Sequence, residues 1–212
     1  MKILHGKKTT LFPIAEQDIE YLHFLLKHEG RMMGQVYFKD FDSWFAYIAG
    51  QILEKQMLIW TCWTKEGKAS KKFGFVSLSD FTPHSVQVHG FTDKQMTKGI
   101  VKILKNPEKY TFAEDALNTI IHHVFEDLRI HRIGSECLYS NLPCKKLLER
   151  VGFMREGRVR HAVCIDKQYE DVVLYGLIKP IKQENLDVRQ QEIGRCEPSS
   201  TKSGVQPEAV AI

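Results

Sequence analysis

The chain has 212 residues, of which 43% are hydrophobic and 26% charged, and its formal net charge is +4. These ordinary values exclude collagen-like, fully disordered and coiled-coil proteins. The length suits one globular domain with its own hydrophobic core, and no apolar run reaches the roughly 18 residues of a membrane-spanning helix.

The five cysteines and nine histidines show no metal-binding spacing. Neither a C-x-x-C pair nor an H-E-x-x-H motif occurs, so we expect no metal site. The first ten residues contain no apolar stretch of signal-peptide length. An odd number of scattered cysteines without such a signal is typical of reduced thiols, so we expect a cytoplasmic protein.

The positive charge is spread along the chain. Residues 183–212 carry three basic and five acidic residues, which leaves +6 on residues 1–182. A modest positive field attracts small anions as readily as nucleic acid. Because there is no arginine-rich arm, we expect neither a nucleic-acid nor a membrane partner.

The first half of the chain predicts helices followed by an antiparallel meander. The expected elements are a strand at 8–13, helices at 16–28 and 42–55, and strands at 57–64, 73–81 and 86–91. The helices are predicted from apolar residues that recur every three or four positions. The last three strands are β-rich runs joined by short polar turns.

The second half predicts a strand–helix–strand crossover. Its expected elements are helices at 93–107 and 111–128, a strand at 132–139, a helix at 143–151, and strands at 153–165 and 172–178. We expect residues 1–182 to form one mixed α/β (α+β) domain. Residues 183–212 have no aromatics and no periodicity, which predicts a polar, disordered tail.

One block in this half carries a family resemblance. It reads Asn141-x-Pro-Cys-x-x-Leu-Leu-Glu-x-x-Gly-Phe153, and Glu156-Gly157 and Asp171 follow it. The block resembles the C-terminal half of the GNAT superfamily of acetyl-CoA-dependent N-acetyltransferases. Within that superfamily it is most similar to the ribosomal-protein N-terminal (RimJ/RimL-like) branch. The resemblance covers about residues 8–178, mainly through the order of elements in the front half.

The resemblance implies a GNAT-like fold with a central mixed, mostly antiparallel sheet flanked by helices. In that fold two neighbouring parallel strands splay apart, and the exposed backbone binds the pantetheine arm of acetyl-CoA like an added strand. The strands at 86–91 and 132–139 would form this splay. Gly90 and Phe91 on the first strand are therefore assigned to cofactor binding.

The resemblance also implies that the pyrophosphate binds backbone N–H groups at the start of the next helix. In this chain Lys109 and Thr111 stand where the family's loop has glycines. A lysine can contact phosphate, but side chains impede close approach of the backbone. A second candidate loop contains Lys98 and Gly99, in a segment (93–107) that we interpret as an insertion beside the cofactor.

The resemblance points to several residues for catalysis. His89 can take a proton from the amine, or it can be a half-buried structural histidine. Cys144, where the family often has serine, can protonate or bond the cofactor sulfur, or merely fill space. Tyr139 and Tyr169 are alternative proton donors. Asn141 either bonds the cofactor or forms the helix-entry turn.

We therefore expect an enzyme that moves an acetyl group from acetyl-CoA to a primary amine, of a protein N-terminus or a small molecule. The amine would attack directly in a ternary complex. The alternative is a catalytically degenerate protein of the same fold that binds or regulates, and the loop without glycines favours it. A basic nucleic-acid-binding module is a third reading.

Overall fold

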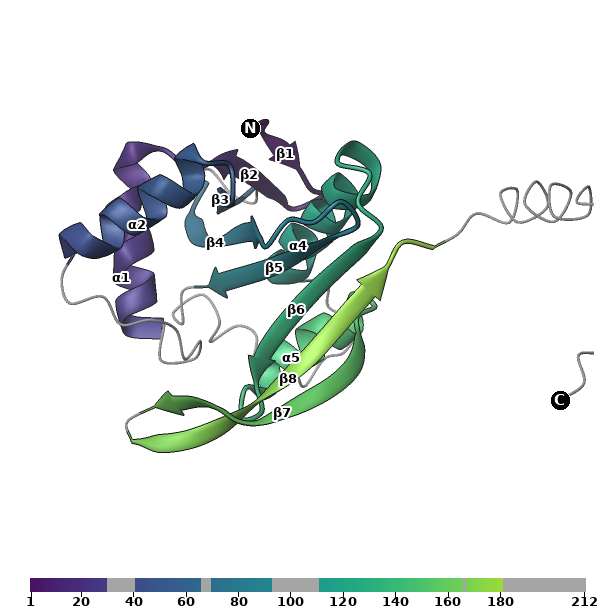
Figure 1. Cartoon of the computed structure of the whole chain (residues 1–212). Coiled ribbons are helices and arrows are strands. Elements are labelled where there is room, and N and C mark those ends of the chain that lie inside the picture. Colours follow the sequence, from purple (N-terminus) through teal and green to yellow (C-terminus); the bar gives the residue numbers. More distant parts are fainter. Residues whose placement is uncertain (30–40, 66–69, 93–110, 166, 181–212) are drawn as a thin grey trace, which may run out of the picture. The chain divides into compact units, whose positions relative to one another are not determined.

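The computed structural model describes residues 1–29, 41–65, 70–92, 111–165 and 167–180 (Figure 1). The helix expected at 93–107, the loop residues Lys98, Gly99 and Lys109, and the tail at 183–212 lie outside these ranges. Among the described residues, no helix has the length and apolarity needed to cross a membrane.

The strands are β1 (Leu4–His5), β2 (Thr9–Pro13), β3 (Leu58–Thr64), β4 (Lys72–Ser79), β5 (Ser85–Thr92), β6 (Arg132–Leu138), β7 (Met154–Ile165) and β8 (Gln168–Ile178). The helical segments are η1 (Glu16–Asp18), α1 (Ile19–Glu29), α2 (Phe41–Leu53), α4 (Phe112–His122), the π-helical turn η3 (His123–Asp127) and α5 (Leu142–Arg150). The predicted strands and helices in the described ranges are thus confirmed, with shifted ends. The two-residue strand β1 was not predicted, because it is too short to show periodicity.

The described strands form one sheet in the order β1-β2-β3-β4-β5-β6-β8-β7 (Figure 1). Only the β5–β6 pair is parallel; the other pairs are antiparallel. The mixed, mostly antiparallel sheet and the β3–β4–β5 meander are therefore confirmed. The register of β7 on β8 shifts between Arg155 and Gly157, so a bulge lies at Glu156.

A hydrophobic cluster lies on each face of the sheet. Trp60 and Ile59 are neighbours in β3 but belong to different clusters, and successive strand residues point to opposite faces. The larger cluster joins the sheet to α4 and α5 and includes Trp60, Leu78, Val86, Ile120, Val124, Ile133 and Leu148. The smaller cluster joins it to α1 and α2 through Leu22, Leu25, Ile48, Ile59 and Phe75. Helices therefore flank both faces.

The start of α4 is attached to the turn between β1 and β2 by one carboxylate. Asp115 accepts hydrogen bonds from the backbone N–H groups of Lys7 (3.0 Å), Lys8 (2.9 Å) and Thr9 (2.9 Å), and from Thr9 Oγ1 (2.6 Å). Asp115 is 1% exposed. A buried carboxylate that accepts several hydrogen bonds retains its charge at neutral pH. This contact fixes the first turn of α4 at one end of the sheet.

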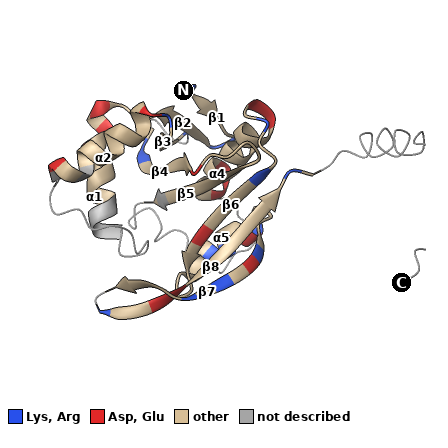
Figure 2. Cartoon of the chain, in the orientation of Figure 1, with Lys and Arg blue, Asp and Glu red and all other residues tan. Residues whose placement is uncertain are grey.

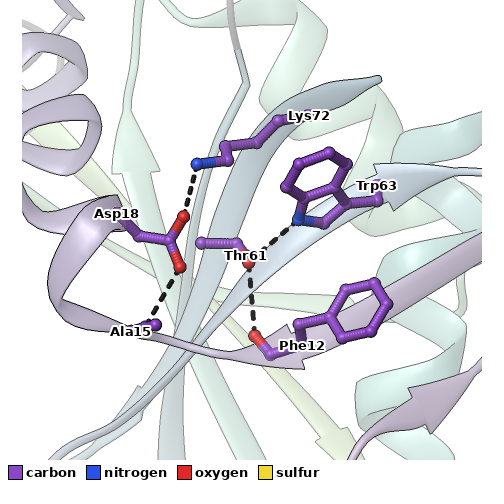
Figure 3. Close-up of polar contacts among 6 residues, drawn as sticks. All are labelled: Phe12, Ala15, Asp18, Thr61, Trp63 and Lys72. Atoms are coloured by element: carbon purple, nitrogen blue, oxygen red, sulfur yellow. Dashed lines mark hydrogen bonds and ion pairs between the residues drawn. The ribbon is translucent and has the colours of Figure 1, made fainter. Parts of the chain in front are cut away.

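The turn η1, which precedes α1, is attached to the sheet through Asp18 (Figure 3). Asp18 accepts a hydrogen bond from Ala15 N (3.0 Å) and forms an ion pair with Lys72, the first residue of β4. The Lys72 ammonium also lies 5.2 Å from the centre of the Trp63 ring. Thr61 Oγ1 accepts from Trp63 Nε1 at 3.1 Å. These contacts join η1, which leads into α1, to β4 and join β4 to β3.

Strand β7 forms the edge of the sheet beside β8. It carries charges of both signs, including Arg155, Glu156, Arg158 and Arg160 (Figure 2). Charged side chains on an edge strand oppose pairing with another chain. Arg132 of β6 pairs with Glu156 across the intervening strand β8.

Candidate active site

Strands β5 and β6 start as a parallel pair and then separate. Their register pairs Ser85 with Arg132, Val86 with Ile133 and Gln87 with Gly134, and no later pair occurs although both described strands continue. The last link is a side chain: Ser135 Oγ donates to the Val88 carbonyl oxygen at 3.1 Å. We call the gap between residues 89–92 of β5 and 136–138 of β6 the splay.

The splay exposes backbone hydrogen-bonding groups of β5. The carbonyl groups of His84 and Val88 are directed to β6, since they accept from Arg132 N (3.0 Å) and Ser135 Oγ. Backbone groups alternate in direction along a strand, so those of Gly90 and Thr92 face the gap. Gly90 is exposed, and a Cβ there would meet nothing nearer than the Phe75 carbonyl at 3.8 Å. The same alternation directs the Phe91 backbone to β4.

Helix α5 begins where β6 ends, beside the splay. Asn141 caps it, because its Oδ1 accepts from Cys144 N at 3.1 Å and its own N–H donates to the Leu138 carbonyl at 3.0 Å. Pro143 lies in the first turn, where the missing N–H costs no helical hydrogen bond. The structure therefore gives Asn141 the helix-entry role, and its contact with a cofactor stays a prediction.

Cys144 lies in that first turn and contacts Cys137 of β6. A hydrogen bond with the Cys137 thiol, together with burial, raises the pKa of Cys144 well above its ordinary value. A thiol with a raised pKa stays protonated at neutral pH, so Cys144 can donate a hydrogen bond but is a poor nucleophile.

His89 lies at the beginning of the splay, with its side chain half buried. Its Nε2 is 3.0 Å from Ser79 Oγ on β4. Burial lowers the pKa of His89, although the carboxylates of Glu136 and Asp80 oppose this shift. A lowered pKa keeps the imidazole neutral near pH 7, which is the form that can accept a proton.

The two candidate tyrosines lie in different places. Tyr139 follows the last residue of β6, and its ring lies 3.9 Å from the Arg158 guanidinium carbon and 4.5 Å from Lys145 Nζ. Tyr169 stacks on His161, with ring centres 5.8 Å apart, in the part of the β7–β8 hairpin that extends beyond β6. Tyr139 therefore lies directly after the strand that borders the splay, whereas Tyr169 lies farther along the hairpin.

Thr111 is the N-cap of α4. Its Oγ1 accepts from Glu114 N (3.0 Å), and its N–H donates to Glu114 Oε2 (2.7 Å). The hydroxyl is thus engaged in the cap, and the first turn holds two buried carboxylates, Glu114 and Asp115. Negative charge stabilises a helix N-terminus but competes with a bound anion. Binding of pyrophosphate at Thr111 stays a prediction.

The sequence interpretation missed the serines that shape this site. Ser79 bonds the histidine ring, and Ser135 bonds β5 at the point where the strands part. Ser77 of β4 pairs with His89 of β5, so these two side chains share a face of the sheet. Ser79 is two residues after Ser77 and therefore points to the same face. The register between the strands, which periodicity does not supply, was needed to see this.

Comparison with known proteins agrees with the fold. Residues 8–154 match the family described as acetyltransferase (GNAT) domain. The chain belongs to this family.

A relative in Bacillus subtilis, the probable N-acetyltransferase YjcK, is 30% identical over 66 residues, which are 31% of this chain and 36% of the relative. The chain thus spans little more than a third of the length of that curated relative.

Solved structures share the fold at low sequence identity. The spermidine N-acetyltransferase of Vibrio cholerae, in complex with CoA and spermine, has a TM-score of 0.67 and 18% identity, over 82% of this chain and 96% of that chain. The acetyl transferase of Salmonella typhimurium that modifies the N-terminal serine of ribosomal protein L7/L12 has a TM-score of 0.66 and 16% identity, over 84% and 100%.

Proposed function

We propose that this protein is an N-acetyltransferase that moves the acetyl group of acetyl-CoA to a primary amine. The observation that carries the proposal is the splay, whose β5–β6 pairing ends after Gln87 and Gly134. A pantetheine arm contains two amides, and unpaired strand backbone binds such an extended chain as it would bind another strand. Gly90 supports this fit, because it offers backbone groups with no side chain in the way.

His89 and the first turn of α5 would handle the protons of the reaction. Acetyl-CoA supplies the thioester carbonyl that an amine can attack. The imidazole of His89 takes the proton that the ammonium loses when its nitrogen bonds the acetyl carbon. As the carbon–sulfur bond breaks, Cys144 or Tyr139 donates a hydrogen bond and then its proton to the leaving thiolate, and the donor regains a proton from water. A backbone N–H of β5 in the splay stabilises the carbonyl oxygen.

The acceptor proposed is a cationic primary amine that approaches His89 from the face of α1 and α2. His89 shares that face with Phe75, since Ser77 pairs with His89 and Phe75 packs against α1 and α2. Glu136 and Asp80, which act electrostatically on His89, attract a positive charge there. The neighbours named above include a spermidine enzyme and one that modifies an N-terminal serine. Both acceptors are ammonium ions in water, and we propose this class for the present chain.

A thermal-shift and turnover experiment tests the proposal. Acetyl-CoA at 100 times its Kd should stabilise the fold by about 2.7 kcal/mol, and pantetheine alone should shift the Tm less at equal concentration. A panel of spermidine, spermine and peptides with a free N-terminal serine should then reveal acetylation. A Tm shift without turnover on any amine would favour the binding-protein alternative. No shift at millimolar acetyl-CoA would refute the proposed transferase and would likewise favour that alternative.

A further inference from the structure

A chain of hydrogen bonds runs from a carboxylate at the end of β4 to the ring of His89. Ser79 Oγ donates to Asp80 Oδ2 at 2.8 Å, and Ser79 Oγ also lies 3.0 Å from His89 Nε2. Ser79 is 7% exposed. We call these three residues the Asp80–Ser79–His89 chain.

The chemistry of the three groups sets the direction of each hydrogen bond. A carboxylate only accepts, so the single hydroxyl proton of Ser79 points to Asp80. Ser79 Oγ can then only accept from the ring, and His89 Nε2 must carry a hydrogen. In a neutral imidazole the other nitrogen, Nδ1, is then the one with a free lone pair.

From this geometry we propose that Ser79 and Asp80 are positioning residues, which hold His89 in the Nε2–H tautomer so that Nδ1 accepts the proton of the acceptor amine. The inference rests on the proposed function, in which His89 is the base. No other reactant is required: Nδ1 gains the proton that the ammonium loses, and the Nε2–H bond to Ser79 is kept in the imidazolium.

Asp80 is exposed and follows the last residue of β4. Asp80 has a φ of 52°, in the left-handed region that few residues other than glycine and asparagine or aspartate adopt. The turn that follows is closed by hydrogen bonds from Thr82 N to the Ser85 carbonyl (2.9 Å) and from Ser85 N to Thr82 Oγ1 (2.9 Å). These hydrogen bonds close the turn between β4 and β5, and Asp80 lies at its start.

The charges that face His89 support proton uptake by a neutral base. Asp80 at the end of β4 and Glu136 on β6 both favour the imidazolium, while burial opposes it and lowers the pKa overall. The ring is thus neutral before the reaction, and two carboxylates stabilise the charge that appears on it during the reaction.

Three variants separate the contributions of Ser79 and Asp80 to the Asp80–Ser79–His89 chain. Ser79→Ala removes the acceptor of Nε2–H, whereas Ser79→Thr keeps a hydroxyl and should rescue. Asp80→Asn keeps an acceptor for the Ser79 hydroxyl but removes the negative charge. Ser77→Ala is the matched control, because Ser77 is also a buried serine of β4 and lies across from His89 without belonging to the chain.

The first readout is independent of activity. Nitrogen NMR of the His89 ring should show the Nε2–H tautomer in the wild type and in Asp80→Asn, and a mixture of tautomers in Ser79→Ala. The pKa of His89 should fall in Asp80→Asn, since a carboxylate that raises it is gone. The Nδ1–H tautomer in the wild type would overturn the proposal.

The second readout is the pH profile of the acetylation rate. Ser79→Ala should lower kcat about 10-fold, a part of the 10²- to 10⁴-fold that a general base contributes, with an unchanged KM for acetyl-CoA. In Asp80→Asn the acid limb of the profile should move to lower pH together with the pKa of His89. An equal decrease of kcat in Ser79→Ala and Ser77→Ala would overturn the proposal.

The two readouts distinguish the two proposals. An active enzyme with the Nδ1–H tautomer refutes the positioning role and leaves the proposed function standing. If the tautomers are as expected but the protein acetylates no amine, the proposed function is refuted. The Asp80–Ser79–His89 chain then has no catalytic role.

Discussion

Ser135 Oγ lies 3.1 Å from the carbonyl oxygen of Val88, one residue beyond the last ladder pair of β5 and β6. In a continuing parallel ladder a backbone N–H of β6 would occupy this carbonyl. A serine hydroxyl takes its place, so β6 is released from β5 while the carbonyl keeps a partner. Both residues are buried, with 8% of Ser135 and 2% of Val88 exposed.

Substitution Ser135→Ala should lower the free energy of unfolding by about 1–3 kcal/mol, because it leaves a buried carbonyl unsatisfied. Urea denaturation measures this change. Ser135→Thr keeps the hydroxyl and is the matched control. Its free energy of unfolding should fall less than that of Ser135→Ala. If Ser135→Ala is as stable as the wild type, the hydrogen bond does not stabilise the start of the splay.

Substitution Gly6→Ala should destabilise the fold by about 1–3 kcal/mol, the usual cost of overpacking. A Cβ at Gly6 would lie 2.1 Å from Asp115 Oδ2 and 2.5 Å from Thr119 Oγ1. Asp115 cannot move away without losing its hydrogen bonds to the β1–β2 turn. Gly50→Ala is the control: a Cβ there meets nothing within 4 Å, and alanine in α2 should add up to about 1 kcal/mol. The reverse order of stabilities would contradict this packing.

Acid should remove the contribution of Asp115 to stability. Burial would raise its pKa, but hydrogen bonds from Thr9, Lys8 and Lys7 outweigh burial and lower the pKa below the ordinary value of 3.8. A lowered pKa in the folded state stabilises the fold above pH 3.8, and this contribution is lost as pH falls through the folded pKa. The stability difference between wild type and Asp115→Asn should therefore be constant near neutral pH and shrink below about pH 4. A difference that does not depend on pH would show that the charge is not involved.

Substitution of Cys144 should separate hydrogen bonding from packing. Cys144→Ser keeps a donor and should retain most of kcat, whereas Cys144→Ala should lower kcat further. Both changes are small in volume, so both proteins should fold, and circular dichroism checks this. Equal rates for the two variants would mean that Cys144 only fills space.

Much of the fold was predictable because its signals are local. Apolar alternation and polar turns predict β3, β4 and β5, and the Asn141 block predicts the start of α5. The contacts of Asp115 and Ser79 were not predictable, because their partners are 106 and 10 residues away. An aspartate in the first turn of a helix also looks like an ordinary dipole-favoured residue.

The register of the sheet determines the features of the candidate site that could not be predicted from the sequence. The sequence placed His89 at the splay, and the structure places it there as well. Its ring nitrogen, however, meets β4 and not β6, which only the β4–β5 register reveals. Candidate residues Lys98, Gly99 and Lys109 lie outside the described residues and remain predictions.

The most direct test of the splay as the acetyl-CoA site is amide hydrogen exchange, followed residue by residue by NMR with and without acetyl-CoA. The account predicts slower exchange in the cofactor complex at Gly90 of β5 and Glu136 of β6, whose N–H groups face the gap, and little change at His89, which is directed to β4. Protection elsewhere in the protein, with none at Gly90 or Glu136, would contradict the assignment of the splay.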